Sequence, residues 1–133
     1  MQAGESALQE LVLFRAMRMD ANLPRIGLSA ATLGVRLGKD IAALADGMVH
    51  PGTGGMSVTP TSASLLPSWV ASELRTGRLT VFTIRPRDLG PDLNFRRDPD
   101  NPEAHGFVEP IRPRTFDDYQ RAVWNTRERW RPI

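Results

Sequence analysis

One stretch of this chain combines residue types that could hold a ligand closely. Between Gly47 and Pro60 the sequence reads Gly-Met-Val-His-Pro-Gly-Thr-Gly-Gly-Met-Ser-Val-Thr-Pro, so three further glycines crowd between a proline and a short β-branched run. Glycine adopts backbone conformations that other residues avoid, and it lets a backbone approach another group. The pattern predicts a site loop that enters a strand, in which Ser57 could bond a ligand hydroxyl.

The basic residues offer a second chemical clue, because sixteen of the seventeen are arginine and Lys39 is the single lysine. Arginine's planar fork suits phosphate and carboxylate, which favours a phosphorylated ligand. A genome rich in G and C gives the same bias without any function, and we prefer that interpretation of the composition. The formal net charge of +2 is too weak a signal to predict nucleic-acid binding.

Several familiar kinds of site are excluded because the sequence lacks their motifs. Gly52-Thr-Gly-Gly lacks the spacing and the lysine of a P-loop, and it is not a G-x-G-x-x-G turn. The two histidines, His50 and His105, begin no recognised ligand pattern, so no metal site is expected, and the absence of cysteine excludes thiolate zinc sites. The sequence around Ser57, Gly54-Gly-Met-Ser-Val-Thr, lacks the final glycine of the G-x-S-x-G elbow of a serine hydrolase.

The elements that must position these residues fit a single α+β domain over residues 1–133. No apolar run approaches the roughly 20 residues that a membrane helix needs. A polar leader, frayed or briefly helical, precedes the first apolar run. Apolar runs and β-branched residues predict four strands, at residues 11–17, 56–59, 79–84 and 105–111.

Helical spacing and capping residues predict the remaining elements. A helix is expected at residues 62–76, and Asp40 caps a short helix at residues 40–45. Thr115 opens a C-terminal helix, whose apolar stripe is Phe116, Tyr119, Val123 and Trp130. Residues 85–104 contain four prolines with many charges, which predicts a long exposed loop.

Arg15 stands where the first strand should supply a core residue. Because side chains alternate along a strand, Leu11, Leu13 and Arg15 share one face. Arg15 either reaches water from the strand end, which we prefer on spacing alone, or is held by the sheet to grip a phosphate bidentately.

Three blocks together resemble a known family. They are Leu13-Phe-Arg-Ala16, the glycine-rich stretch from Gly47 to Val58, and His105-Gly-Phe-Val-Glu-Pro110, followed by a helix with aromatic and basic residues. In order and spacing they resemble the small type VI secretion effector toxins with an ADP-ribosyltransferase-like fold. The resemblance runs from about residue 11 to residue 130, and its middle block is the most specific. It implies two small mixed sheets around an NAD⁺ cleft, with flanking helices.

The resemblance also implies roles for single residues. Arg15 corresponds to the first-strand arginine near the dinucleotide phosphates, and His105 to the histidine of the third block. Met56 departs from the family, where threonine is usual, and Glu109 matches no family acid. The loop and strand that hold the nicotinamide ribose correspond to Thr53, Gly54, Gly55 and Ser57.

The chemistry of NAD⁺ cleavage is compatible with these assignments. Positive charge builds on the ribose as the nicotinamide bond breaks, so a carboxylate or hydrogen bonds should lie near it. We therefore expect His105, Glu109 and Ser57 to be catalytic, with His105, Phe107 and Glu109 on one face of a strand. Each has a structural alternative: a solvated acid for Glu109, a bonded structural histidine for His105, and a cross-strand hydroxyl for Ser57.

The resemblance implies an NAD-dependent toxin that transfers ADP-ribose to an unknown macromolecule or to water. It also implies a cytoplasmic site of action in the target cell, delivery by a secretion system without a signal peptide, and a cognate immunity protein in the producer. One rival hypothesis is an RNA-directed enzyme with 2′-phosphotransferase chemistry. The other is a non-enzymatic protein that docks a partner through its arginines and tryptophans.

Overall fold

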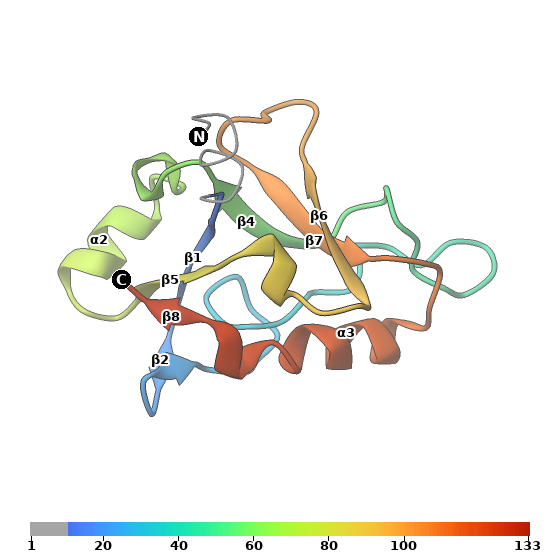
Figure 1. Ribbon diagram of the computed structural model, residues 1–133, viewed down its shortest axis with the longest axis horizontal. Helices are drawn as coiled ribbons and strands as arrows, with labels where there is room; N and C mark the ends of the chain where they lie inside the picture. The colour runs from blue at the N-terminus through green and yellow to red at the C-terminus, as the bar shows by residue number, and fades with distance from the viewer. Residues whose placement is uncertain (1–10) are drawn as a thin grey trace, which may run out of the picture.

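The computed structural model describes residues 11–133, and its central feature is a six-stranded antiparallel sheet (Figure 1). β1 lies near the middle, where it pairs with β4 on one side and β5 on the other. A separate two-stranded sheet joins β2 (Met19–Asp20) to β3 (Leu23–Pro24). In spatial order the main sheet contains β6 (Leu93–Arg97), β7 (Gly106–Pro110), β4 (Met56–Pro60), β1 (Leu13–Met17), β5 (Thr80–Ile84) and β8 (Arg131–Pro132).

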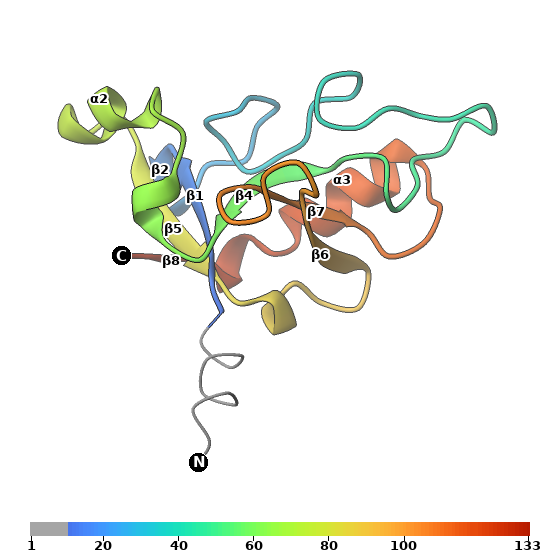
Figure 2. The same ribbon diagram turned by 90° about the horizontal axis from the view of Figure 1, so that it is seen from above.

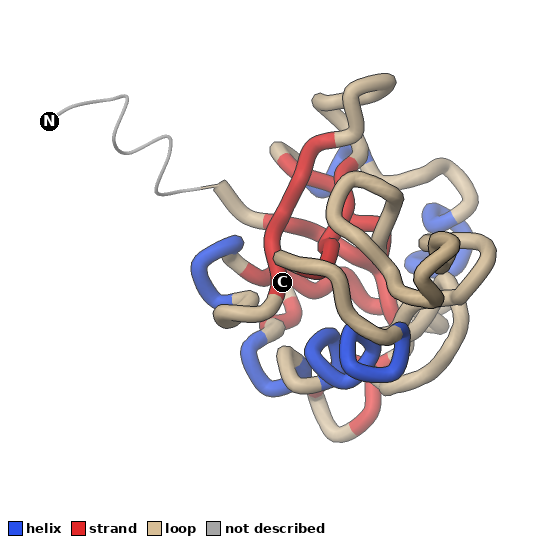
Figure 3. Tube along the Cα trace, turned by 90° about the vertical axis from the view of Figure 1, so that its right-hand side faces the viewer, coloured by secondary structure: helices blue, strands red, loops and turns tan. Residues whose placement is uncertain are grey.

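Helices are few and lie around the sheet. α2 (Val70–Arg75) and α3 (Phe116–Trp124) lie at opposite ends of the molecule (Figure 2). Three short 3₁₀ turns complete the set within residues 11–133, namely η1 (Ala63–Leu65), η2 (Pro86–Asp88) and η3 (Arg127–Arg129). Much of the remaining chain forms loops that wrap the strands (Figure 3). No helix among residues 11–133 is long and apolar enough to cross a membrane.

The core forms where α3 and the C-terminal segment pack on the sheet. Thr115 caps α3 as expected, since its hydroxyl accepts a hydrogen bond from the Asp118 N–H at 3.1 Å. Tyr119 and Val123 of α3 are fully buried, together with Trp130 beyond the helix. The main cluster joins these side chains to apolar residues of β1, β4, β5, β6 and β7.

Several sequence predictions of secondary structure are wrong. The two mixed sheets are instead one antiparallel sheet and a two-stranded ribbon. The helix expected at 62–76 is split into η1 and α2, because Pro67 between them cannot continue an earlier turn. The helix from Thr115 ends at Trp124, so Trp130 reaches the core from a later turn. The polar leader lies outside the described residues.

Two further corrections concern residues near the site. Residues 40–45 form no helix, because the Asp40 carboxylate accepts bonds from Arg36 and residues 42–47 are exposed, with no core to pack against. The predicted loop at 85–104 contains η2 and β6. Leu93 and Phe95 of β6 face the core at a spacing of two residues, a pattern that the neighbouring charges and prolines concealed.

Tyr119 joins α3 to the seam between β4 and β7. Its hydroxyl donates to the Val108 carbonyl and accepts from the Met56 N–H at 3.1 Å, and the side chain is fully buried. We expect Tyr119→Phe to lower the free energy of unfolding by about 2 kcal/mol, because it leaves a buried donor and a buried acceptor unpaired. Urea unfolding measures this. A loss below about 0.5 kcal/mol would contradict the role given to this hydroxyl.

Candidate functional site

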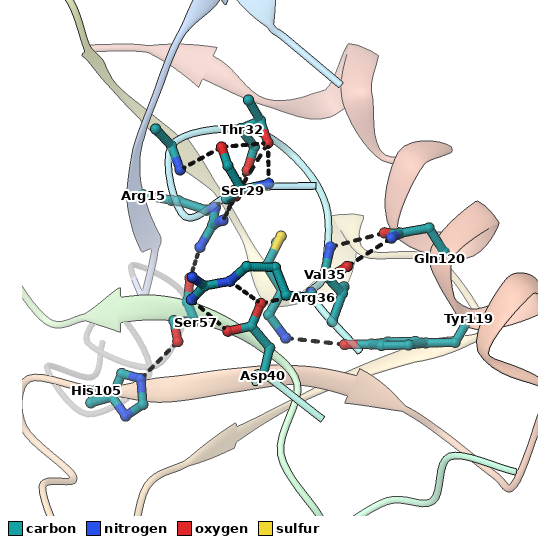
Figure 4. Close-up of polar contacts among 12 residues, drawn as sticks. Arg15, Ser29, Thr32, Val35, Arg36, Asp40, Ser57, His105, Tyr119 and Gln120 are labelled. Atoms are coloured by element: carbon teal, nitrogen blue, oxygen red, sulfur yellow. Dashed lines mark hydrogen bonds and ion pairs between the residues drawn. The ribbon is translucent and has the colours of Figure 1, made fainter. Parts of the chain in front are cut away.

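A cavity of about 180 Å³ lies beside β1 and β4. Its polar lining comes from six residues, Arg15, Arg36, Asp40, Ser57, Thr59 and His105. They gather between β1, the loop after β3 and the paired strands β4 and β7 (Figure 4). Part of the apolar lining comes from the segment that leads into α2, with Leu66, Pro67, Trp69 and Val70.

Arg15 lies in the cavity wall but is only 6% exposed. Its guanidinium donates to the Thr32 carbonyl from Nε at 3.2 Å and from Nη2 at 2.8 Å, and to the Ser57 carbonyl from Nη1 at 2.7 Å. Burial lowers the pKa of Arg15 to about 10, so the group is still cationic at neutral pH. The expectation that Arg15 reaches water from a strand end is therefore wrong.

No ion pair among residues 11–133 involves Arg15. The carboxylate that contributes most to its electrostatics is Asp40, which is itself paired with Arg36. Arg36 donates to Asp40 from Nε at 3.1 Å and from Nη2 at 3.0 Å, in the bidentate arrangement typical of arginine and carboxylate. This wall therefore contains two guanidinium cations and one carboxylate, which leaves an excess positive charge.

Ser57 and His105 meet across neighbouring strands. Ser57 lies opposite Phe107 in the β4–β7 register, which brings its Oγ to 3.1 Å from His105 Nε2. The other ring nitrogen of His105, Nδ1, lies 2.8 Å from the Asp98 carboxylate. The hydrogen bond with His105 is the main cause that lowers the pKa of Asp98, so this carboxylate is ionised at neutral pH.

Asp98 is a residue that the sequence analysis missed. It directly follows β6, and its backbone N–H donates to the His105 carbonyl at 3.0 Å, which closes the β6–β7 hairpin. One sequence feature could have indicated Asp98. It lies seven residues before His105, and the two residues stand at the facing ends of two segments that could pair as a hairpin. The assignment of residues 85–104 to one loop hid that signal.

Three of the predicted ligand-binding residues lie outside the cavity wall, namely Thr53, Gly54 and Gly55. The Thr53 hydroxyl donates to the His50 carbonyl at 2.8 Å. A Cβ at Gly54 would lie 2.3 Å from the Asp40 carbonyl oxygen, and one at Gly55 would lie 2.4 Å from that of Val108. The glycines thus let the loop pass close to two backbones, which sets the start of β4 and the position of Ser57.

Glu109 also lies outside the cavity wall. It is 3% exposed and accepts hydrogen bonds from the Gly52 N–H at 2.8 Å, from Asn94 at 3.0 Å and from Arg96 at 2.9 Å. The solvated-acid alternative is therefore wrong. These hydrogen bonds connect Glu109 to the glycine-rich loop and to β6. Glu109 therefore stabilises the position of that loop on the sheet.

The residue types that bind metals are not gathered in this site. Among residues 11–133, no group of three or more histidine, cysteine, aspartate or glutamate side chains is arranged to hold a metal ion. Comparison with known proteins identifies no relative: no family model, no curated protein and no solved structure matches the chain. The resemblance to effector toxins thus stays a prediction.

Proposed function

We propose that this chain is an NAD-dependent ADP-ribosyltransferase-like toxin with an ADP-ribosyltransferase-like fold. The observation that supports the proposal best is the buried cation of Arg15, without an ion-pair partner of its own among residues 11–133, in the same cavity wall as Ser57 and His105. A buried charge is costly unless it is paired, so an anionic ligand that enters this cavity recovers part of the cost.

The shape of the cavity suggests which part of NAD⁺ it takes. A volume of about 180 Å³ is smaller than a whole dinucleotide, so we place the nicotinamide ribose and the nearest phosphate inside and the adenosine outside. Arg15 and Arg36 face the phosphate in this arrangement. Ser57 and His105 offer polar groups to the ribose hydroxyls, and Trp69 supplies an aromatic surface at the mouth.

The chemistry needs a carboxylate near the ribose, because positive charge develops there as the glycosidic bond breaks. Asp40 lines the cavity, whereas Glu109 does not. We therefore give Asp40 the stabilising role that the sequence analysis gave to Glu109. Arg36 orients the Asp40 carboxylate through two hydrogen bonds, of 3.1 Å from Nε and 3.0 Å from Nη2.

The biological setting proposed for this activity comes from the resemblance. We propose that the toxin acts in the cytoplasm of a target cell after delivery by a secretion system, with an unidentified macromolecule or water as acceptor. A cognate immunity protein that covers the cavity mouth would protect the producer. Co-purification tests the partner, and free entry of NAD⁺ into that complex would count against occlusion of the cavity.

Binding of NAD⁺ can be tested through Arg36, which is partly exposed at the site. We expect Arg36→Gln to weaken NAD⁺ binding about tenfold or more in calorimetric titration, because it removes a charge-assisted phosphate contact. Arg87→Gln is the matched control, since Arg87 is exposed on η2 and does not line the cavity. Equal affinity in both variants would contradict the placement of the phosphate.

The rival functions give different results in the same experiments. An RNA-directed enzyme binds RNA, and its affinity for RNA falls steeply as salt is added. A partner-docking protein keeps its activity when Ser57 is changed and loses it when exposed arginine or tryptophan positions are changed. Trp69, which is 50% exposed, is the first such position to test.

A further inference from the structure

Ser57, His105 and Asp98 form a continuous hydrogen-bonded series. The distances are 3.1 Å from Ser57 Oγ to His105 Nε2 and 2.8 Å from His105 Nδ1 to Asp98 Oδ2. Ser57 lies in β4, His105 directly precedes β7 and Asp98 directly follows β6, and these three strands are neighbours in the sheet. The order of groups is that of a nucleophile, a general base and a residue that orients the base.

The direction of the protons follows from the chemistry of the carboxylate. An ionised Asp98 can only accept, so His105 Nδ1 carries the proton of their shared hydrogen bond. When the ring is neutral, Nε2 is the acceptor of the hydrogen bond that the Ser57 hydroxyl donates. A serine whose proton already points at a neutral imidazole is arranged for nucleophilic attack.

We propose that Ser57 is an activated nucleophile and that this chain hydrolyses carboxylic esters with a small apolar acyl group. The acyl group fits the apolar lining that Leu66, Pro67 and Val70 give to the same cavity as Ser57. The volume of about 180 Å³ limits that group to a short chain. Ser57 is half-buried and the His105 side chain is 30% exposed, so a substrate can reach both.

Stabilisation of the oxyanion falls to Arg36. Its Nε and Nη2 are bonded to Asp40, while Nη1 makes no hydrogen bond with residues 11–133. Arg36 lines the same cavity as Ser57 (Figure 4). A guanidinium held in place by a carboxylate can meet the negative charge that develops on the carbonyl oxygen without reorganising.

The reaction is balanced by one water molecule. Ser57 Oγ attacks the ester carbon while His105 Nε2 takes its proton; the carbon–oxygen bond to the alcohol then breaks, and His105 returns the proton to the departing alcohol. Water attacks the acyl-serine with His105 again as base, which releases the carboxylic acid and restores Ser57. The products are one alcohol and one acid.

The local backbone explains why motif reasoning excluded this chemistry. The G-x-S-x-G motif describes a serine on a sharp turn between a strand and a helix. Ser57 instead lies within β4, and a cross-strand neighbour supplies the base. The required constellation is defined by distances between side chains, and it recurs on unrelated folds with different sequence motifs.

Labelling with a fluorophosphonate probe, read out by mass spectrometry, tests the nucleophile directly. We expect stoichiometric labelling of Ser57, at a rate that falls by about 10²-fold or more in His105→Gln. Ser64→Ala is the matched control, because the Ser64 hydroxyl bonds to Ser62 at 2.8 Å and not to a histidine. Absence of label on Ser57 in the folded protein would overturn the proposal.

Hydrolysis of p-nitrophenyl butyrate tests the full reaction and the part played by Asp98. We expect turnover that is lost in Ser57→Ala and falls by about 10²-fold or more at neutral pH in Asp98→Asn, because an amide can donate to Nδ1 and move the ring proton to Nε2. Circular dichroism and melting temperature establish that each variant is folded. An Asp98→Asn protein with the wild-type rate and pH profile would give Asp98 a purely structural role and overturn the relay.

These experiments contain no NAD⁺, so their outcome is independent of the proposed function. Ser57 labelling without NAD⁺ binding would support the esterase alone. NAD⁺ binding without labelling or ester turnover would support the proposed function and remove this inference.

Discussion

Replacing Arg15 with methionine is expected to lower the free energy of unfolding by about 3 kcal/mol and to abolish NAD⁺ binding. The guanidinium donates hydrogen bonds to the Thr32 and Ser57 carbonyls. The donor–acceptor distances lie between 2.7 and 3.2 Å. Methionine fills much of the same space but leaves these buried carbonyls without donors. The removal of a desolvated charge offsets only part of that loss.

Urea unfolding followed by tryptophan fluorescence measures the stability effect, and calorimetry measures the binding effect. Arg15→Lys is the informative companion, because it keeps the charge and loses the fork that spans Thr32 and Ser57. We expect it to fall between wild type and methionine in stability. If Arg15→Met has the wild-type urea midpoint and an unchanged dependence of the free energy of unfolding on urea, the carbonyl contacts make no net contribution to stability. That result would contradict the structural role of Arg15.

Gly55→Ala is the second substitution with a large expected effect. An added Cβ would lie 2.4 Å from the Val108 carbonyl oxygen and 3.2 Å from the Phe107 Cβ. The backbone of Gly55 has φ of +153°, and its N–H donates to the Asp40 carbonyl at 2.8 Å. Because β4 and β7 must move apart to admit the methyl group, we expect a loss of about 3 kcal/mol in the free energy of unfolding.

Gly52→Ala provides the matched comparison. Gly52 has φ of +86°, but a Cβ there meets nothing within 4 Å, so only the backbone conformation is strained. We expect a loss of about 1 kcal/mol. Urea unfolding of the two variants side by side separates the cost of the steric contact at Gly55 from the cost of a positive φ alone at Gly52. Equal losses in the two variants would mean that the contact with Val108 does not limit this position.

Local patterns predicted part of this structure well. Strands were expected at the positions of β1, β4, β5 and β7, because alternation and β-branched residues are visible within short windows. Capping by Thr115 was predicted for the same reason, since the cap and its partner lie three residues apart. Arg15, Ser57 and His105 line one cavity.

The rest depended on contacts between distant residues. The order of strands places β4 beside β7, and no sequence window contains both. Asp40 reaches the cavity because its carboxylate folds back on Arg36, an alternative to helix capping that aspartate commonly takes. The position of Glu109 on a strand predicted that it lies in the site. Its carboxylate instead accepts hydrogen bonds from Gly52 and Arg96, which gives it a structural role.

The most direct test of NAD⁺ cleavage in this cavity is release of nicotinamide from NAD⁺ by the purified protein, measured beside its Asp40→Asn variant. Asparagine keeps the shape of Asp40 and removes the negative charge that the developing ribose cation needs. We expect wild type to release nicotinamide and the variant to be at least about 10²-fold slower. No release by wild type, or equal rates in the two proteins, would contradict NAD⁺ cleavage at this site.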